Sequence, residues 1–238
     1  MLLDIEGTTT PVDFVYHTLF PYAGRKVEGF LRENSHKPEI EALLQDLQVQ
    51  HRLDRTEGSG PPVLHGEPAE ARLGSLVAYV QWLISKDSKC TALKSLQGKI
   101  WQQGFVSGEL HGQVYPDVPR AFERWRRQNR KICIYSSGSA LAQQLLFRTV
   151  ASGDLTPHIS GFFDTQIGMK SAVESYKKIA ASSGCAPGEC LFISDAAKEV
   201  EAAQAAGMQA ILCDRDAHAS RLPGAPTRIT SFDRIFPD

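Results

Sequence analysis

The second half of the sequence alternates between two hydrophobic periods, and this alternation limits the fold more than any other feature. Three short apolar runs have the length and composition of buried strands: KICIY at 131–135, CLFIS at 190–194 and QAILC at 209–213. Helical periodicity lies before or between them, at 117–129, 139–151 and 196–206. Strands that alternate with helices form parallel sheets covered on both faces. The sequence therefore predicts a doubly wound, Rossmann-like α/β core.

The first half has a different pattern. A very short apolar run, residues 1–3, precedes Asp4, and helix-like patterns then occupy 12–50 and 75–105. Between them, residues 54–74 are rich in Gly, Pro and charge, which predicts a loop or hairpin tip. The simplest organisation is a helical cap inserted after the first strand of the core. We expect the core to comprise residues 1–10 and 116–238, and the cap residues 11–115.

Composition narrows the class of protein. The 238 residues are 42% hydrophobic and 22% charged, ordinary globular values that exclude a wholly disordered chain. A net charge of -1 gives no reason to expect nucleic acid or an anionic membrane as a partner. No apolar run approaches the ~20 residues that span a bilayer, and five cysteines without C-x-x-C spacing are typical of reduced thiols. We expect a soluble, cytoplasmic protein without a signal peptide, and a monomer.

Polar residues follow three of the expected strands. Asp4 and Glu6 follow the first, Ser136 and Ser137 the strand at 131–135, and Asp195 the strand at 190–194. Taken singly, each is as well explained as a helix N-cap or a polar turn. In parallel sheets, however, ligands bind outside the carboxyl ends of the strands. The combination therefore predicts a binding site at this edge.

The segment DIEGTTT, residues 4–10, is the most informative of these. Alternation along an extended chain places the carboxylates of Asp4 and Glu6 on the same side. Gly7 then allows a turn that a Cβ would hinder. Two carboxylates in one space repel each other unless a proton or a cation separates them. A hard cation such as Mg²⁺, with water and substrate phosphate completing its shell, suits this arrangement.

At this point the chain resembles the haloacid dehalogenase-like phosphatases. D-x-[DE]-G-T after an N-terminal strand is similar to their first motif, and Ser136, Lys170 and Asp195 with Glu199 are similar to the second, third and fourth. More narrowly, the chain resembles the enolase-phosphatase family of methionine salvage, also called acireductone synthases. That likeness is carried by LLDIEGTTTP, LFPYA, LQGKIWQQGF, IYSSGS and FFDTQIGMKSAVESY, at 2–11, 19–23, 96–105, 134–139 and 162–176.

The resemblance implies a role for each matched residue. Asp4 would be the nucleophile that forms an aspartyl-phosphate, and Glu6 the acid and base that serves the leaving group and the water. One Mg²⁺ per subunit would be bound by the carboxylates of Asp4 and Asp195 and by the carbonyl oxygen of Glu6. The residues that would bind the substrate phosphate are Ser136, Ser137 and Lys170.

The family's substrate, 2,3-diketo-5-methylthiopentyl 1-phosphate, is enolised before the phosphate is removed. The base for enolisation stays open between Glu6 and a group of the insert. Four aromatic residues could line the methylthio group, although core packing explains each of them better: Phe20, Tyr22, Trp101 and Phe105. The basic residues between 120 and 131 are interpreted as a solvated helix face.

Other functions remain to be weighed against this one. A generic Mg²⁺-dependent phosphatase of the same superfamily is the nearest alternative. A dehalogenase fits less well, since it needs neither a general acid at Glu6 nor Mg²⁺. A phospho-binding or interaction protein that lost turnover would keep the fold, but the full set of Asp4, Glu6, Lys170 and Asp195 argues against it.

Overall fold

The computed structural model describes residues 1–238 except 57, 59, 89 and 217–227. It divides into two compact units. The core unit comprises Met1–Phe14 and Gly108–Asp238, and the insert unit comprises Val15–Ser107. The chain therefore passes between units at residues 14/15 and 107/108, whereas the sequence placed the boundaries at 10/11 and 115/116.

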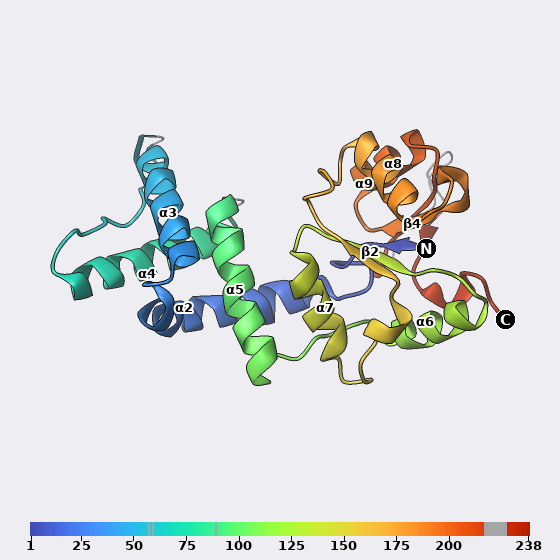
Figure 1. The fold of residues 1–238 in the computed structure, drawn as a ribbon, viewed down its shortest axis with the longest axis horizontal. Coiled ribbons are helices and arrows are strands. Elements are labelled where there is room, and N and C mark those ends of the chain that lie inside the picture. The colour runs from blue at the N-terminus through green and yellow to red at the C-terminus, as the bar shows by residue number, and fades with distance from the viewer. Residues whose placement is uncertain (57, 59, 89, 217–227) are drawn as a thin grey trace. The chain divides into compact units, whose positions relative to one another are not determined.

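The core unit contains a six-stranded, fully parallel sheet in the order β3-β2-β1-β4-β5-β6 (Figure 1). The strands are β1 (Leu2–Leu3), β2 (Cys133–Tyr135), β3 (Gly161–Phe163), β4 (Leu191–Ser194), β5 (Gln209–Cys213) and β6 (Arg228–Ile229). The parallel α/β architecture confirms the predicted fold class. β3 and β6 were not predicted, because β3 begins at a glycine and β6 at an arginine, and neither lies in an apolar run like the one at 131–135 that contains β2.

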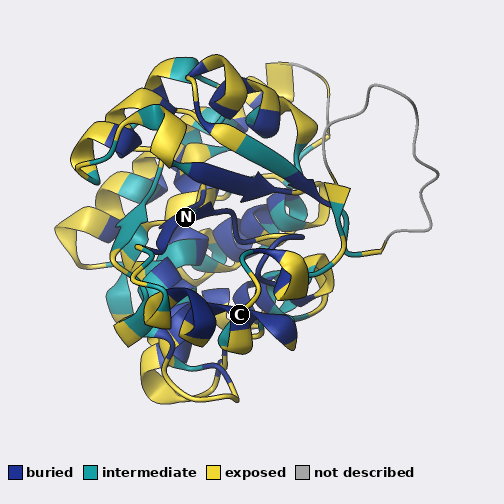
Figure 2. Ribbon diagram, turned by 90° about the vertical axis from the view of Figure 1, so that its right-hand side faces the viewer, coloured by how far each residue is buried: buried dark blue, intermediate teal, exposed yellow. Residues whose placement is uncertain are grey.

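Helices cover both faces of this sheet. They are α6 (Asp117–Arg127), α7 (Ala140–Arg148), α8 (Val173–Ser182) and α9 (Ala197–Ala205), after a short α1 (Val12–Phe14). Tyr176 of α8 and Ala203 of α9 share one apolar cluster with Phe192 of β4. On the other face, Phe147 of α7 packs against Phe162 of β3, 6.3 Å between ring centroids. The central strands β1, β2 and β4 are consequently buried along their whole length, and buried parts of the sheet are dark blue in Figure 2.

Local sequence explains where two of these helices begin and end. The hydroxyl of Ser139 accepts a hydrogen bond from the amide of Ala142 and caps α7. Gly207, with φ +88°, follows α9 in the left-handed conformation that ends helices. The prediction of a fully solvated basic face on α6 is wrong for Arg124, which is buried. Its guanidinium donates to main-chain carbonyls near the C-terminus, including that of Phe232 at 2.7 Å, and this satisfies it inside the core.

The insert unit is helical, as the sequence predicts. A π-helical turn, Val15–Leu19, leads into α2 (Phe20–Asn34), α3 (Pro38–Thr56), α4 (Ala69–Ser85) and α5 (Thr91–Ser107). The expected loop at 54–74 is too long, because α3 and α4 extend into it from both sides. Asp54 stays helical since its carboxylate accepts a hydrogen bond from the hydroxyl of Tyr79 at 2.6 Å. Among the described residues, no helix is long and apolar enough to cross a membrane.

Candidate active site

The parallel register brings the ends of three central strands to one edge of the sheet. β1 lies between β2 and β4, so Asp4, Ser136 and Asp195 all stand just beyond the carboxyl end of a strand. The amide of Asp4 donates to the carbonyl of Ile193 at 3.0 Å, which continues the β1–β4 ladder to Asp4 itself. The structure therefore assembles at one edge residues that are up to 191 positions apart, counting from 4 to 195.

The Asp4 loop, residues 4–10, folds back on itself directly after β1. The hydroxyl of Thr9 donates to the carbonyl of Asp4 at 3.0 Å, and the amide of Gly7 donates to the carbonyl of Thr10 at 2.8 Å. Gly7 has φ +66°, and a Cβ at this position would overlap the carboxylate of Asp195. Glycine is therefore required twice over, by the turn and by the close approach of Asp195.

Lys170 joins two carboxylates of the site. Its ammonium lies 2.5 Å from Oδ1 of Asp4 and 2.7 Å from Oε2 of Glu199. Ser194 completes this cluster, with its hydroxyl 3.2 Å from Oδ2 of Asp4 and 2.9 Å from Oε2 of Glu199. Sequence reasoning missed Ser194, although its position immediately before Asp195 at the end of a strand was a usable signal.

Hydroxyl groups fix the loop that carries Lys170. The hydroxyl of Tyr176 donates to the carbonyl of Lys170 itself at 2.6 Å. Those of Ser175 and Tyr135 donate to the carbonyls of Met169 and Gly168 at 2.8 and 2.9 Å. Three consecutive carbonyls are thus held by α8 and β2. The long Lys170 side chain, 13% exposed, consequently starts from a fixed main chain.

Burial and mutual repulsion shape the charges of this cluster. Burial, and then the neighbouring Asp4 carboxylate, raise the pKa of Asp195 to about 7. The same two causes raise the pKa of Glu199. Burial opposes the charge of Lys170, but the carboxylates of Asp4 and Glu199 outweigh it and raise its pKa above the ordinary value. One ammonium therefore lies among three carboxyl groups, and the raised pKa values of Asp195 and Glu199 disfavour the ionisation of these two.

This arrangement fits a divalent cation. The negative charge of Asp4 is one of the causes that raise the pKa of Asp195, so the ionised form of Asp195 is disfavoured while no cation is bound. A cation bound by the carboxylates of Asp4 and Asp195 would offset this repulsion. Within the described part of the chain, no three His, Cys, Asp or Glu side chains are grouped closely enough to hold a metal ion by themselves. Mg²⁺ suits two carboxylates because it keeps several waters and takes oxygen from a phosphate.

The remaining predicted site residues border this cluster. Ser136 is buried, and its hydroxyl accepts a hydrogen bond from the amide of Gly138 at 3.3 Å. Ser137 is exposed and precedes α7. Glu6 is exposed, unlike buried Asp4, and its main chain forms a bridge with Thr10. Glu6 and Ser137 therefore stand where the site meets solvent.

The aromatic residues proposed for the methylthio group lie in the insert unit. Tyr22 and Phe105 are buried, and Tyr22 packs closely against Gly104. Phe20 and Trp101 are partly exposed and stacked, with ring centroids 6.3 Å apart. The structure thus favours core packing for the first two.

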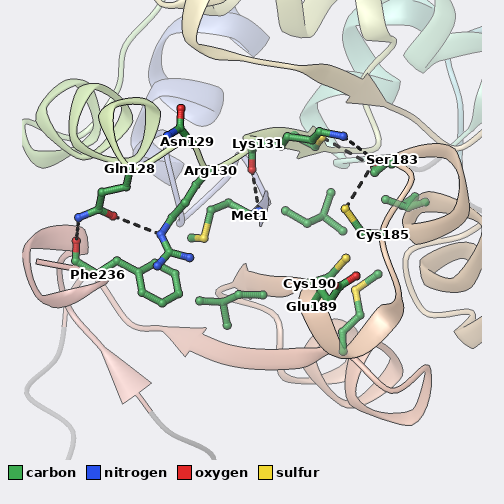
Figure 3. Close-up of a pocket in the computed structure, with 15 residues that line it drawn as sticks. Met1, Gln128, Asn129, Arg130, Lys131, Ser183, Cys185, Glu189, Cys190 and Phe236 are labelled. Carbon is green, nitrogen blue, oxygen red and sulfur yellow. Dashed lines mark hydrogen bonds between the residues drawn. The ribbon is translucent and has the colours of Figure 1, made fainter.

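A cavity of about 410 Å³ lies at the opposite edge of the sheet, where the strands begin (Figure 3). Met1, Lys131 and Cys190 line it just before β1, β2 and β4, and the amino group of Met1 donates to the carbonyl of Lys131 at 2.7 Å. The thiols of Cys185 and Cys190 are free, and burial raises the pKa of Cys190. None of the predicted site residues is among those that line this cavity, so it is separate from the Asp4 edge.

The chain is similar to known proteins over most of its length. A family model of haloacid dehalogenase-like hydrolases matches residues 1–207. The crystal structure of the UTR4 protein from Saccharomyces cerevisiae is 31% identical, with a TM-score of 0.72 over 98% of each chain. CbbY from Rhodobacter sphaeroides, solved in complex with phosphate, is 13% identical with a TM-score of 0.59 over 99% of this chain and 95% of its own. This last likeness shows a common fold alone.

Sequence relatives place the chain more narrowly. Enolase-phosphatase E1 of Synechococcus elongatus is 49% identical over 99% of this chain and 96% of its own, and enolase-phosphatase E1 of Drosophila melanogaster is 43% identical over 100% and 90%. The chain belongs to the haloacid dehalogenase-like hydrolases and, within them, to the enolase-phosphatase family. This membership confirms the predictions of the family, of a phosphatase enzyme and of an enolase-phosphatase function.

Proposed function

We propose that the chain enolises 2,3-diketo-5-methylthiopentyl 1-phosphate and then hydrolyses its phosphate ester, releasing the acireductone and inorganic phosphate. The observation that carries this proposal is the buried Asp4 at the carboxyl edge of β1, held by Lys170. Enolase-phosphatase relatives that match nearly the whole chain support the substrate. A net charge of -1 gives no general electrostatic reason for a nucleic acid or an anionic membrane as the partner, so we propose a small-molecule substrate and a cytoplasmic monomer.

In the first phosphoryl transfer, a carboxylate oxygen of Asp4 attacks phosphorus. An aspartyl-phosphate bond forms while the bond from phosphorus to the ester oxygen breaks, and the departing oxygen takes a proton from Glu6. Lys170, already paired with Asp4, also offsets the negative charge of the transferring group. Ser136 and Ser137 donate hydrogen bonds to the phosphate oxygens.

In the second transfer, water releases the phosphate. The Glu6 carboxylate takes a proton from a water molecule, whose oxygen attacks phosphorus while the bond to Asp4 breaks. Inorganic phosphate leaves, and both carboxyl groups return to their starting forms. The exposure of Glu6 supports this role because water reaches it directly.

The residues present suit one Mg²⁺ per subunit, held by the carboxylates of Asp4 and Asp195 and by the carbonyl oxygen of Glu6. When bound, the cation offsets repulsion between the nucleophile and the phosphate and polarises oxygen atoms of the substrate. Enolisation further requires a base beside the carbon next to a carbonyl group. Glu6 is one candidate, and a group of the insert unit is the other.

A paired assay tests the proposal. The diketo phosphate is incubated with the protein and Mg²⁺, and then with a chelator, while inorganic phosphate and the ultraviolet absorbance of the conjugated enediol are followed together. We expect both signals with Mg²⁺ and neither with the chelator. Phosphate without the enediol, or phosphate from other esters only, would identify a generic phosphatase instead.

A further inference from the structure

Arg215 makes contacts that the catalytic steps above do not use. Its side chain is only 5% exposed, and it directly follows β5 and Asp214 at the same sheet edge as Asp4. The guanidinium lies between two rings, with its central carbon 4.3 Å from the centroid of Tyr115 and 4.4 Å from that of Phe232. A buried, stacked arginine of this kind is fixed in orientation as well as in position.

The donors of this guanidinium converge on the Asp4 loop. Nε and Nη2 both donate to the carbonyl of Thr8, at 2.9 and 2.6 Å. Nη1 forms an ion pair with Asp117 at 2.7 Å, and the same carboxylate oxygen accepts the amide of Phe232 at 2.6 Å. Two bonds to a single carbonyl, with the charge balanced by a buried carboxylate, hold Thr8 far more firmly than one neutral hydrogen bond would.

Thr8 in turn contacts Asp195, one of the carboxyl residues of the site. Its hydroxyl accepts a hydrogen bond from the amide of Asp195 at 3.0 Å, and the residue is fully buried. Next to it, the carbonyl of Thr9 accepts the amide of Tyr115 at 2.9 Å. The chain of contacts therefore runs from Asp117 through Arg215 and Thr8 to Asp195, without passing through any group that would touch the substrate.

We propose that Arg215 is a positioning residue, which fixes the Asp4 loop so that Asp4 and Asp195 stand at the separation a divalent cation requires. Residues that orient metal ligands through hydrogen bonds commonly change metal affinity by about 10- to 100-fold when they are replaced. The inference rests on the proposed function for its choice of cation. The restraint on the loop is independent of that function.

Arg215→Lys tests the inference, with Arg124→Lys as its matched control. Lysine keeps the charge opposite Asp117 but cannot supply two donors to Thr8 while remaining stacked. Arg124 is also buried and also donates to carbonyls, but those carbonyls belong to Phe232, Ile235 and Phe236 rather than to the Asp4 loop. Both variants lose arginine packing, and only the first loosens the loop.

Two readouts avoid any dependence on turnover. Calorimetric titration with Mg²⁺ should show affinity weakened about tenfold in Arg215→Lys and unchanged in Arg124→Lys. Amide hydrogen exchange, read on the peptide containing residues 4–10, should be faster in Arg215→Lys alone. In the diketo phosphate assay, kcat should fall with little change in KM, since the substrate contacts remain.

A second variant keeps the inference testable if Arg215→Lys does not fold. Thr8→Val removes the acceptor for the Asp195 amide at the other end of the same link and leaves the buried ion pair in place. Thr8→Val should weaken Mg²⁺ binding, as Arg215→Lys does. If neither variant differs from Arg124→Lys in Mg²⁺ affinity and loop exchange, Arg215 is a structural residue only. A wild-type protein without phosphatase activity would overturn the proposed function, whereas the exchange result would still decide the role of Arg215.

Discussion

The ammonium of Lys170 lies 2.5 Å from Oδ1 of Asp4, although the two residues are 166 positions apart in the sequence. Both side chains are largely buried, with 13% and 6% of their surface exposed. Lys170 also contacts Glu199, so a single positive charge serves two carboxylates while Asp195 stands beside them. The site is therefore negative overall when all groups are ionised, and a divalent cation would offset this charge before a negatively charged phosphate binds.

Replacing Lys170 by Met should lower kcat by about 100- to 1,000-fold, because the transferring group loses its fixed positive charge. Lys177→Met is the matched control. Lys177 is half-exposed, and among the residues that the structure describes its ion pair is with Glu174, three residues away on the same helix. Steady-state phosphate release checks both variants. Equal activity in the two would remove Lys170 from the proposed site.

The raised pKa of Asp195 makes a prediction for the metal-free protein. Its ordinary value is 3.8 and its folded value about 7, so between these pH values the folded chain holds a proton that the unfolded chain lacks. The contribution of this group to stability therefore falls as pH rises from about 4 to about 7. Thermal denaturation in chelator should show Asp195→Asn gaining Tm relative to wild type as the pH increases.

Mg²⁺ supplies the control for that experiment. At pH 8 the added cation should raise the Tm of the wild-type protein, since it binds the ionised Asp195 and stabilises the folded state. Asp195→Asn should gain much less, because an amide is a weaker and uncharged ligand. Two results would contradict the proposed cation site. One is a Tm difference between Asp195→Asn and wild type that does not change with pH, and the other is an equal rise in Tm of both proteins when Mg²⁺ is added.

Gly7→Ala should weaken Mg²⁺ binding and phosphatase activity, because the new Cβ would overlap the carboxylate of Asp195. Gly184→Ala separates this clash from backbone strain. Gly184 has almost the same φ, +67° against +66°, but no atom of the described residues lies within 4 Å of its added Cβ. Both variants should lose about 1–2 kcal/mol of stability from the left-handed backbone. Only Gly7→Ala should weaken Mg²⁺ binding in calorimetric titration. If both variants lost the same Mg²⁺ affinity, backbone strain rather than the clash with Asp195 would explain the effect.

Most of the core fold could be predicted from the sequence. β4 and β5 are apolar runs of four and five residues with helices beside them, so their period and surroundings are readable. β1 is readable only because Asp4 follows it, and β3 and β6 begin at a glycine and an arginine and lie in no such apolar run. The ends of the 54–74 loop were misplaced because tertiary contacts, such as Tyr79 with Asp54, extend α3 beyond its local sequence signal.

The site was predictable where residues follow strands, and less so elsewhere. Asp4, Ser136 and Asp195 stand at strand ends, and parallel topology alone brings these together. Lys170 lies in a loop, where no period marks it, and only its resemblance to a family motif singled it out. Arg215 carried no such mark, and Ser194 was marked only by its place at the end of a strand, immediately before Asp195. Their importance comes from contacts with Asp4, Glu199 and Thr8 that exist only in the folded chain.

Phosphate release by Asp4→Asn tests the central claim most directly. The amide keeps the volume of the side chain but cannot form an aspartyl-phosphate, so we expect release from the diketo phosphate to fall by at least about 1,000-fold. Asp214→Asn, which alters a partly exposed carboxylate at the end of β5, should retain nearly full activity. If folded Asp4→Asn protein released phosphate within about tenfold of the Asp214→Asn rate, Asp4 would not be the nucleophile.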